Sequence, residues 1–281
     1  MLPDIDQGKA ERPPRGQARA ALARARTWLF VPGTGGTRLQ KAYNSPAHEV
    51  VLDLEDAVDP VDKAAARTAV VEWLRSAGTA WVRVNAVGTP WHEDDLTALA
   101  NCPGLRGIVL PKCDLPAAVA RLRASLSEEV GLVGLIETAV GIRDVHALAM
   151  AGVDRLSFGS LDFAADVGCS PDDDLLVHAR AQIVIGSRCA SLPAPVDGVT
   201  PALNAQRVAE DARRARSSGF RGKLCIHPMQ LEPADTALRP SDDEIAWAHR
   251  VLEAATQGGV VVVDGEMVDA PVVERARRIA G

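Results

Sequence analysis

The sequence has few cysteines and no long apolar run, and each absence excludes a class of protein. Its five cysteines are scattered, odd in number and without a C-x-x-C pair, which argues against a disulfide framework or a structural zinc site. No apolar run approaches the ~18 residues needed to span a bilayer. No apolar block typical of a secretory signal stands at the N-terminus. We therefore expect a cytoplasmic protein that has no membrane partner.

The sequence also lacks an excess of basic residues. It contains 37 acidic and 31 basic residues, which gives a net charge of −6. A surface that follows nucleic-acid phosphates needs a basic excess, so we expect no nucleic-acid partner. A local basic pocket for a small anion is still compatible with this charge. The length of 281 residues suffices for one barrel-sized domain or for two ordinary domains.

Residues 1–25 differ in composition from the rest of the chain. The stretch "ERPPRGQARAALARAR" is rich in Arg and Ala, as in an organelle transit peptide, but Asp4, Asp6 and Glu11 argue against that interpretation. We expect residues 1–25 to be a flexible tail that leads into a short helix and lies outside the fold.

From Thr27 onward, short β-rich runs alternate with amphipathic helical stretches. The runs cover residues 27–32, 49–55, 80–85, 107–112, 131–137, 154–160, 193–199 and 223–228. Most do not alternate polar and apolar residues, which is typical of parallel strands covered on both faces. Eight strands with helices between them predict a (β/α)₈ TIM barrel over residues 26–235. A doubly wound sheet is the alternative, but "VPGTGGTRLQKA" lacks the spacing of a dinucleotide-binding fingerprint.

The last segment, residues 236–281, departs from this rhythm. Ser241 and Glu244 form a capping box at the start of a helix. The Val260–Val263 run and the turn at Asp264-Gly265 predict a hairpin, and a final helix is expected to start near Pro271. The barrel does not need this helix-hairpin-helix extension, so we expect it to act as a lid.

Polar side chains stand at the ends of most predicted strands, where the mouth of such a barrel lies. Glu137 and Asp162 are about one β/α unit apart, so we expect them at adjacent strand ends that face the same mouth. Two carboxylates with open positions suit Mg²⁺, which keeps several waters. No Cys/His cluster accompanies them, which disfavours zinc. The alternative is structural, with Asp162 as a helix N-cap and Glu137 in an ion pair.

Two basic residues also end predicted strands. Arg83 closes "WVRVNA", and its guanidinium can hold a carboxylate or a carbonyl oxygen of a small oxo or hydroxy acid. A salt bridge from Arg83 to Glu55 or Asp56 is the structural alternative, and both roles are compatible. Lys112 in "LPK" can add positive charge, or form a Schiff base if it is desolvated.

Four further residues have both a functional and a structural interpretation. Arg38 and Lys41 follow the "PGTGGT" loop, where a helix N-terminus can bind phosphate, or they form a solvated helix face. His227, which precedes Pro228, is either catalytic or structural. Asp269 fits an N-cap, and its place in the extension also makes it a candidate for a second role.

These segments together resemble the citrate lyase beta-subunit-like branch of the HpcH/HpaI aldolase family. The resemblance covers residues 26–280 in order, through "RTWLFVPGTGGTRLQKA", "VVLDLEDAV", "VRVNAVGT", "VLPK", "LIETAVG", "FGSLDFAADVG", "GKLCIHPMQ" and "GEMVDAPVVERA". It implies a Mg²⁺-dependent (β/α)₈ lyase that cleaves or forms a carbon–carbon bond beside a hydroxyl-bearing carbon.

The resemblance also implies roles for residues of the barrel. Glu137 and Asp162 would be the metal ligands, and Arg83 would contact the oxo-acid product. Glu55 and Asp56 would support the metal waters or the arginine. The carboxylate of the substrate would be bound by backbone amides around Gly159, Ser160 and Leu161.

Other implied roles concern the acyl carrier and the assembly. Relatives often have a basic residue and a proline where this chain has Gly35-Gly36, so Arg38 and Lys41 would have to contact the CoA phosphates. Asp269 would reach the active site of a neighbouring subunit in a homotrimer or hexamer. Residues 236–281 would then form a lid on that neighbour.

The resemblance leaves several activities open. Expected substrates are short 3-hydroxyacyl thioesters such as citramalyl-CoA, malyl-CoA or a citryl thioester, cleaved to acetyl-CoA and a 2-oxo acid such as pyruvate or oxaloacetate. The alternatives are a class II aldolase that releases pyruvate from free hydroxy-keto acids, and a malyl-CoA thioesterase or malate synthase-like activity. A non-catalytic assembly subunit is disfavoured by the intact set of Glu137, Asp162 and Arg83.

Overall fold

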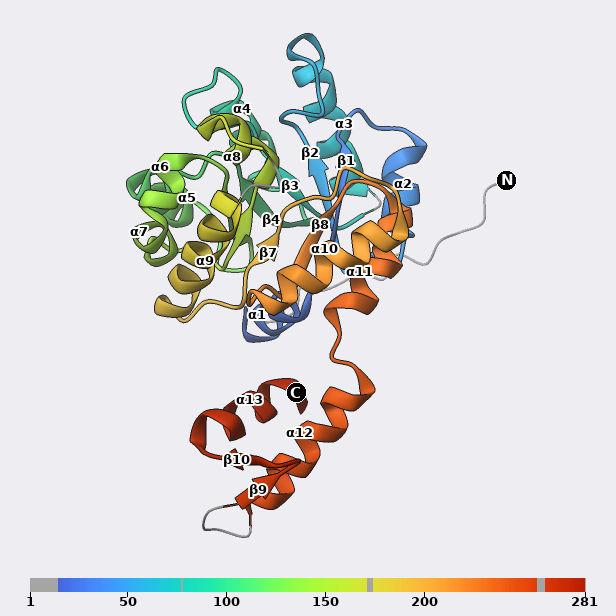
Figure 1. The fold of residues 1–281 in the computed structure, drawn as a ribbon. Helices are drawn as coiled ribbons and strands as arrows, with labels where there is room; N and C mark the ends of the chain where they lie inside the picture. The colour runs from blue at the N-terminus through green and yellow to red at the C-terminus, as the bar shows by residue number, and fades with distance from the viewer. Residues whose placement is uncertain (1–14, 77, 171–173, 257–260, 281) are drawn as a thin grey trace, which may run out of the picture. The chain divides into compact units, whose positions relative to one another are not determined.

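The computed structural model describes residues 15–76, 78–170, 174–256 and 261–280 of the chain. The chain divides into two compact units, one that ends at Thr236 and one that begins at Ala237 (Figure 1). None of the helices in these described ranges is long and apolar enough to cross a membrane.

In the described part of the first unit, eight parallel strands close into a barrel, and each strand pairs with its neighbour in sequence. The strands are β1 (Thr27–Pro32), β2 (Glu49–Asp53), β3 (Ala80–Arg83), β4 (Leu105–Leu110), β5 (Gly131–Ile136), β6 (Arg155–Phe158), β7 (Val196–Asp197) and β8 (Gly222–Cys225). Every residue of β2, β3 and β6 is buried, because the barrel interior covers one face and helices cover the other. The predicted (β/α)₈ TIM barrel is therefore confirmed.

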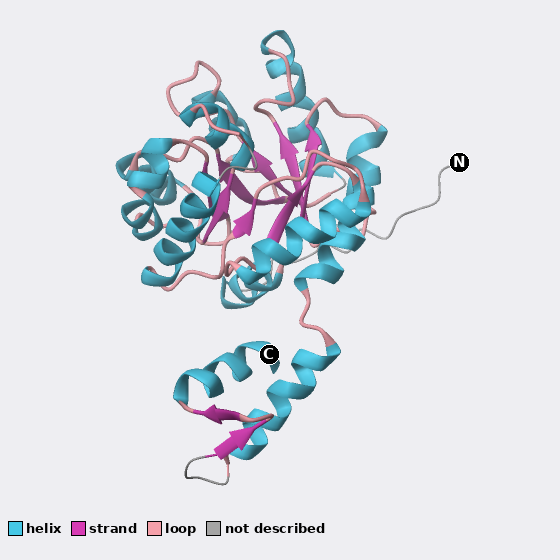
Figure 2. Ribbon diagram, in the orientation of Figure 1, coloured by secondary structure: helices cyan, strands magenta, loops and turns pink. Residues whose placement is uncertain are grey.

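Helices surround the strands, as Figure 2 shows. They are α1 (Arg15–Arg24), α2 (Thr37–Tyr43), α3 (Lys63–Ser76), α4 (His92–Leu99), α5 (Pro116–Ser125), α6 (Ala139–Arg143), α7 (Val145–Met150), α8 (Ser160–Val167), α9 (Asp174–Cys189), α10 (Ala205–Ser217) and α11 (Leu231–Leu238). Two short 3₁₀ helices, η1 (Pro60–Asp62) and η2 (Pro228–Gln230), follow β2 and β8.

Helix α1 corrects the prediction that residues 1–25 lie outside the fold. Leu22 and Ala25 are buried in one hydrophobic cluster with Trp28 of β1. The fully buried Arg155 donates hydrogen bonds from Nη1 to the carbonyls of Leu22 and Ala25, at 2.6 and 2.8 Å. A buried guanidinium needs such acceptors, so residues 22–25 belong to the barrel.

The second unit has the predicted helix-hairpin-helix order. Its elements are α12 (Asp242–Ala255), β9 (Val261–Val263), β10 (Glu266–Val268) and α13 (Ala270–Ala280). Ser241 and Glu244 form the expected capping box of α12, and β9 pairs antiparallel with β10. Val260 of the predicted run lies outside the described residues. That this unit serves as a lid stays a prediction.

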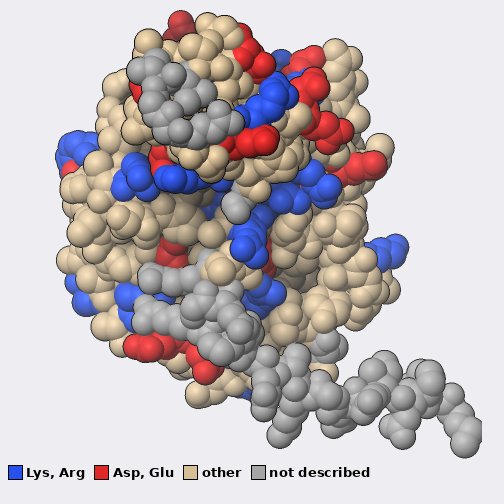
Figure 3. Space-filling view, turned by 90° about the horizontal axis from the view of Figure 1, so that it is seen from below, with Lys and Arg blue, Asp and Glu red and all other residues tan. Residues whose placement is uncertain are grey.

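The surface drawn in Figure 3 carries charges of both signs. Lys and Arg side chains and Asp and Glu side chains both occur on this face. The described residues drawn there therefore mix both signs of charge rather than one.

Candidate active site

A cavity of about 450 Å³ lies at the carboxyl ends of the barrel strands. Its described lining includes four carboxylates, Asp53, Asp56, Glu137 and Asp162, and one guanidinium, that of Arg83. This side of the barrel is therefore negatively charged before any ligand binds. An excess of carboxylates in a half-enclosed space attracts a cation.

Arg83, the last residue of β3, is the best-held side chain of the cavity. Its Nε and Nη2 donate to the two carboxylate oxygens of Asp53, at 2.7 and 2.6 Å. Its guanidinium also lies 5.1 Å from the centre of the Phe30 ring. A bidentate contact and a stacked ring fix the plane of the guanidinium. Asp53 was not predicted as a site residue, although its place at the end of β2 next to β3 could have indicated it.

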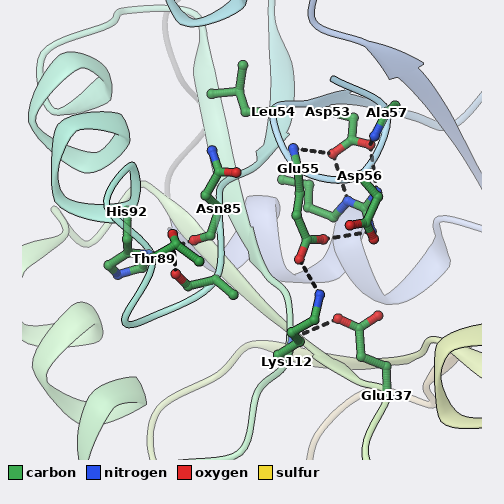
Figure 4. Close-up of polar contacts among 12 residues, drawn as sticks. Asp53, Leu54, Glu55, Asp56, Ala57, Asn85, Thr89, His92, Lys112 and Glu137 are labelled. Carbon is green, nitrogen blue, oxygen red and sulfur yellow. Dashed lines mark hydrogen bonds and ion pairs between the residues drawn. The ribbon is translucent and has the colours of Figure 1, made fainter. Parts of the chain in front are cut away.

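Glu55 connects Arg83 with Lys112, as Figure 4 shows for the Glu55–Lys112 pair. Arg83 Nη1 lies 3.0 Å from Glu55 Oε2, and Lys112 Nζ donates to Glu55 Oε1 at 2.6 Å. Burial raises the pKa of Glu55, and the two cations oppose this shift. Both structural alternatives from the sequence therefore hold: Arg83 is paired with Glu55, and it lies 3.7 Å from the half-exposed Asp56.

Glu137 follows β5 and has only one of its two oxygens paired. Oε1 accepts a 2.7 Å hydrogen bond from the backbone N–H of Lys112, whose φ of 43° is unusual for a residue other than glycine. Oε2 is buried and has no hydrogen-bond partner among the described residues. Burial raises the pKa of Glu137 to about 8, and the nearby carboxylates of Glu55 and Asp162 add to the shift.

Gly159 leaves the space that Glu137 occupies. A Cβ atom at position 159 would overlap both Oε2 and Cβ of Glu137. The unpaired oxygen thus lies against bare backbone, where a bound cation would give it a partner. An exposed carboxylate, Asp162 in the first turn of α8, lines the same cavity.

These features fit a magnesium ion better than zinc. The described residues contain no group of three or more His, Cys, Asp or Glu side chains that could hold a metal. Mg²⁺ requires few protein ligands, because waters and substrate oxygens complete its octahedron. Glu137 Oε2 and Asp162 would supply the protein oxygens.

The start of α8 provides only part of the predicted carboxylate site. Gly159, Ser160 and Leu161 all line the cavity. However, the N–H of Gly159 donates to the carbonyl of Ile136 at 2.8 Å, so this amide is used within the barrel. That the amides of this segment bind a substrate carboxylate stays a prediction, for which Gly159 has no spare N–H in this structure. The N–H groups of Ser160 and Leu161 belong to the first helical turn, which has no acceptors inside the helix.

Lys63, at the start of α3, was not predicted from the sequence as a site residue. It is 6% exposed, and its Nζ donates to the carbonyls of Leu54 and Glu55 at 2.8 and 2.7 Å. Burial lowers the pKa of Lys63. This lysine fixes the backbone that carries Glu55.

Several predicted residues are not brought to this cavity. Arg38 and Lys41 are exposed on α2 and do not line it. His227 is the N-cap residue of η2: its ring Nδ1 accepts a 3.2 Å hydrogen bond from the backbone N–H of Met229. This bond fits the structural interpretation of His227. Other polar residues, which were not predicted as site residues, also lie outside this cavity. Asp197 is buried and bound to Arg180, and Asn85, Thr89 and His92 form a separate group in Figure 4.

Asp269 lies in the second unit, where it caps α13. Its Oδ1 accepts from the backbone N–H of Val272 at 3.1 Å. This contact is the structural role that the sequence suggested for Asp269. A carboxylate that uses one oxygen for a cap retains a second oxygen for another partner.

A family model and curated relatives both match this chain over most of its length. The model of the HpcH/HpaI aldolase/citrate lyase family matches residues 26–228. A citrate lyase subunit beta-like protein from Deinococcus radiodurans is 32% identical, with 92% of this chain and 98% of that protein covered. A (3S)-malyl-CoA thioesterase from Cereibacter sphaeroides is 33% identical, with coverage of 90% and 92%.

A solved structure extends the similarity to the fold. The crystal structure of protein CitE from Mycobacterium tuberculosis in complex with magnesium, acetoacetate and coenzyme A superposes with a TM-score of 0.81. The two chains are 32% identical, and the match covers 92% of this chain and 97% of the other.

Proposed function

The chain belongs to the HpcH/HpaI aldolase/citrate lyase family, and from this premise we propose that it is a Mg²⁺-dependent carbon–carbon lyase. Its substrate would be a short 3-hydroxyacyl-CoA such as citramalyl-CoA or malyl-CoA, or a citryl thioester, and its products would be acetyl-CoA and a 2-oxo acid. The observation that carries this proposal is the buried, unpaired Oε2 of Glu137, a residue that lines one cavity together with Asp162 and Arg83.

Arg83 is suited to bind the 2-oxo acid. A guanidinium has five N–H donors; Asp53 takes two of them, and Nη1 is close to Glu55. The remaining donors are held in a fixed plane at the cavity wall. Because Asp53 and Phe30 already fix this plane, binding costs little side-chain entropy. Arg83 would hold the substrate carboxylate and stabilise negative charge that develops on the neighbouring oxygen.

Four carboxylates near Arg83 would have different roles. Glu137 and Asp162 would hold the ion, and bound Mg²⁺ would polarise the oxo group of the 2-oxo acid as a Lewis acid. Glu55, pinned between Arg83 and Lys112, keeps the arginine in place. Asp56 lines the cavity with a half-exposed side chain and would orient waters there.

Asp269 completes the proposal. As the carbon–carbon bond breaks, the 3-hydroxyl of the substrate would lose its proton to a water oriented by Asp56. The acyl thioester leaves as its enolate, which would take up a proton from Asp269 of a neighbouring subunit. This role requires an assembly in which the second unit of one chain covers the cavity of another, as in a homotrimer or a hexamer. The five free cysteines of the described residues agree with a proposed location in the reducing cytoplasm.

The experiment that tests this function offers purified protein several substrates. Malyl-CoA, citramalyl-CoA, a citryl thioester and free 4-hydroxy-2-oxo acids are incubated with Mg²⁺ and with EDTA. We expect acetyl-CoA and a 2-oxo acid from a thioester only when Mg²⁺ is present. Cleavage of the free acids while every thioester stays intact would refute the proposal and favour the class II aldolase.

A thioester hydrolase is the second candidate, because a (3S)-malyl-CoA thioesterase is among the relatives. The same incubation separates the two activities. A hydrolase releases free CoA and the intact hydroxy acid, whereas a lyase releases acetyl-CoA.

A further inference from the structure

A second cavity, of about 390 Å³, adjoins the active-site cavity. The two share Ser160, Leu161 and Val199, so the start of α8 and the loop after β7 form a common wall. We call the second one the arginine cavity. It is lined by the basic side chains Arg180, Arg207, Arg214 and Lys223.

The charge of the arginine cavity is opposite to that of its neighbour. Asp211 is the one carboxylate among its described lining residues. Asp197 is not part of the lining but pairs with Arg180 and Lys223. Arg180, Arg214 and Lys223 outnumber these two acids even if Arg207 is set aside. The active-site cavity, in contrast, has four carboxylates and one guanidinium. A ligand of the arginine cavity is therefore an anion.

Two of its cations are buried and rigidly placed. Arg180 is 8% exposed; its Nε donates to Asp197 at 2.8 Å, and its guanidinium lies 5.4 Å from the centre of the Phe158 ring. Lys223 is 2% exposed, and its Nζ donates to the carbonyl of Gly198 and lies 3.6 Å from Asp197. Charges desolvated to this degree attract an anion more strongly than solvated ones.

The opposite wall is also preorganised. Asp211 accepts from Arg214 Nη2 at 2.8 Å and from the hydroxyl of Thr200 at 2.8 Å. The buried Gln230 donates to the carbonyls of Thr200 and Ala202 at 2.7 and 3.0 Å. The loop after β7 is thereby held against α10 without help from a ligand. The shape of the arginine cavity is therefore fixed by hydrogen bonds within the barrel.

We propose that the arginine cavity is a binding site for a small oxyanion, that is, a phosphate or carboxylate group, separate from the catalytic cavity. Guanidinium groups bind such planar or tetrahedral oxyanions by paired N–H donors. The wall formed by Ser160 and Leu161 lies between this anion and the carboxylates of the active site. The inference does not depend on which reaction the enzyme catalyses.

The test is a calorimetric titration of the full-length protein with inorganic phosphate. We expect one saturable site, and we expect Arg214→Gln to weaken binding by about tenfold or more, as for loss of a charged donor. Arg213→Gln is the matched control, because Arg213 is exposed on the same helix and does not line the cavity. It should bind phosphate within about twofold of the original protein. Since Arg214 is half exposed, neither substitution should prevent folding.

Arg83→Met separates the two cavities. Phosphate binding that persists in Arg83→Met and weakens in Arg214→Gln supports the proposal. Binding that is lost in Arg83→Met and unchanged in Arg214→Gln would place the anion in the catalytic cavity and overturn it, as would the absence of phosphate binding. Competition identifies the source of the group: oxaloacetate displaces phosphate if a substrate carboxylate occupies the site, and binds alongside it if a free oxyanion does.

Discussion

Replacing Glu137 with Gln should make the metal-free protein more stable above pH 5 while abolishing its response to Mg²⁺. Gln keeps the shape of the side chain and can accept the hydrogen bond from the Lys112 N–H. The substitution removes the negative charge that burial and the carboxylates of Glu55 and Asp162 oppose. The expected gain therefore depends on pH.

The magnitude follows from the raised pKa of Glu137. In the metal-free protein the pKa is about 8 in the folded state, and 4.5 is the ordinary value that applies to the unfolded chain. Between these two values the folded state binds more protons, so the free energy of unfolding falls as pH rises. The slope is about 1.4 kcal/mol per pH unit, which gives a loss of about 3 kcal/mol between pH 5 and pH 7. The stability that the folded protein gains by binding the Glu137 proton more tightly than the unfolded chain is fully present below pH 4.5 and is lost by about pH 8. The Glu137→Gln variant has no such loss, because its amide does not titrate.

The assay is urea denaturation of both proteins in EDTA from pH 5 to pH 8. The stability difference between Glu137→Gln and the original protein should grow with pH by about 3 kcal/mol over the first two units. Adding Mg²⁺ should stabilise the original protein at pH 8, because a bound ligand shifts unfolding by mass action, and should leave Glu137→Gln unchanged. If the free energy of unfolding depends on pH in the same way in both proteins, or if Mg²⁺ stabilises both equally, Glu137 is not a buried acid that binds the metal ion.

Three further substitutions test other parts of the site. Gly159→Ala puts a methyl group where Glu137 lies, so Mg²⁺-induced stabilisation and activity should both be lost, as followed by thermal melts and turnover. Lys63→Met removes the donor of two buried backbone carbonyls and should lower the free energy of unfolding by about 2–4 kcal/mol, measured in urea. Asp269→Asn should lose thioester turnover by about 100-fold or more, because Asn cannot donate the proton that the enolate needs. The variant should still fold, because Asn caps a helix as well as Asp, and it should keep Mg²⁺ binding, because the proposed metal ligands are unchanged.

The glycine and lysine substitutions each have a control on the same chain. Gly186→Ala adds a methyl group that meets Val145 at 3.3 Å, away from the cavity, and should keep the Mg²⁺ response. Lys41→Met alters an exposed lysine and should cost less than about 0.5 kcal/mol. Equal effects in a test variant and its control would contradict the corresponding prediction. Unchanged thioester kinetics in Asp269→Asn would leave this residue with its helix-cap role alone.

The barrel could be predicted from the sequence because its strands are buried on both faces. Few other folds accommodate unbroken apolar runs at such regular spacing. A short helix near the N-terminus was predicted, but that helix α1 packs against the barrel could not be predicted in this way. Its contribution depends on Arg155, a residue from the sixth strand whose guanidinium reaches the carbonyls of Leu22 and Ala25. Contacts between residues so far apart in sequence leave no local pattern.

The candidate site was predicted unevenly for a similar reason. Residues that close a strand, such as Glu137 and Arg83, are visible because a charge interrupts an apolar run. Lys63 stands at the start of a helix, where a lysine usually faces solvent, so its burial depends on the fold of the preceding loop. His227 shows that a polar residue at a strand end can have a local role, here as the acceptor for the backbone N–H of Met229.

Helix α1 also determines where the chain can be shortened. The family match begins at residue 26, and a domain cut at that position would look complete from its sequence. It would lack Leu22 and Ala25, so Arg155 Nη1 would lose both carbonyl acceptors inside the barrel and Trp28 would lose part of its cover. Nε of Arg155 would keep its bond to the carbonyl of Ala194, but leaving Nη1 of a buried guanidinium without acceptors costs about 1–3 kcal/mol or more. A shortened chain that begins before Arg15 should fold, and one that begins at residue 26 should be poorly expressed or aggregate.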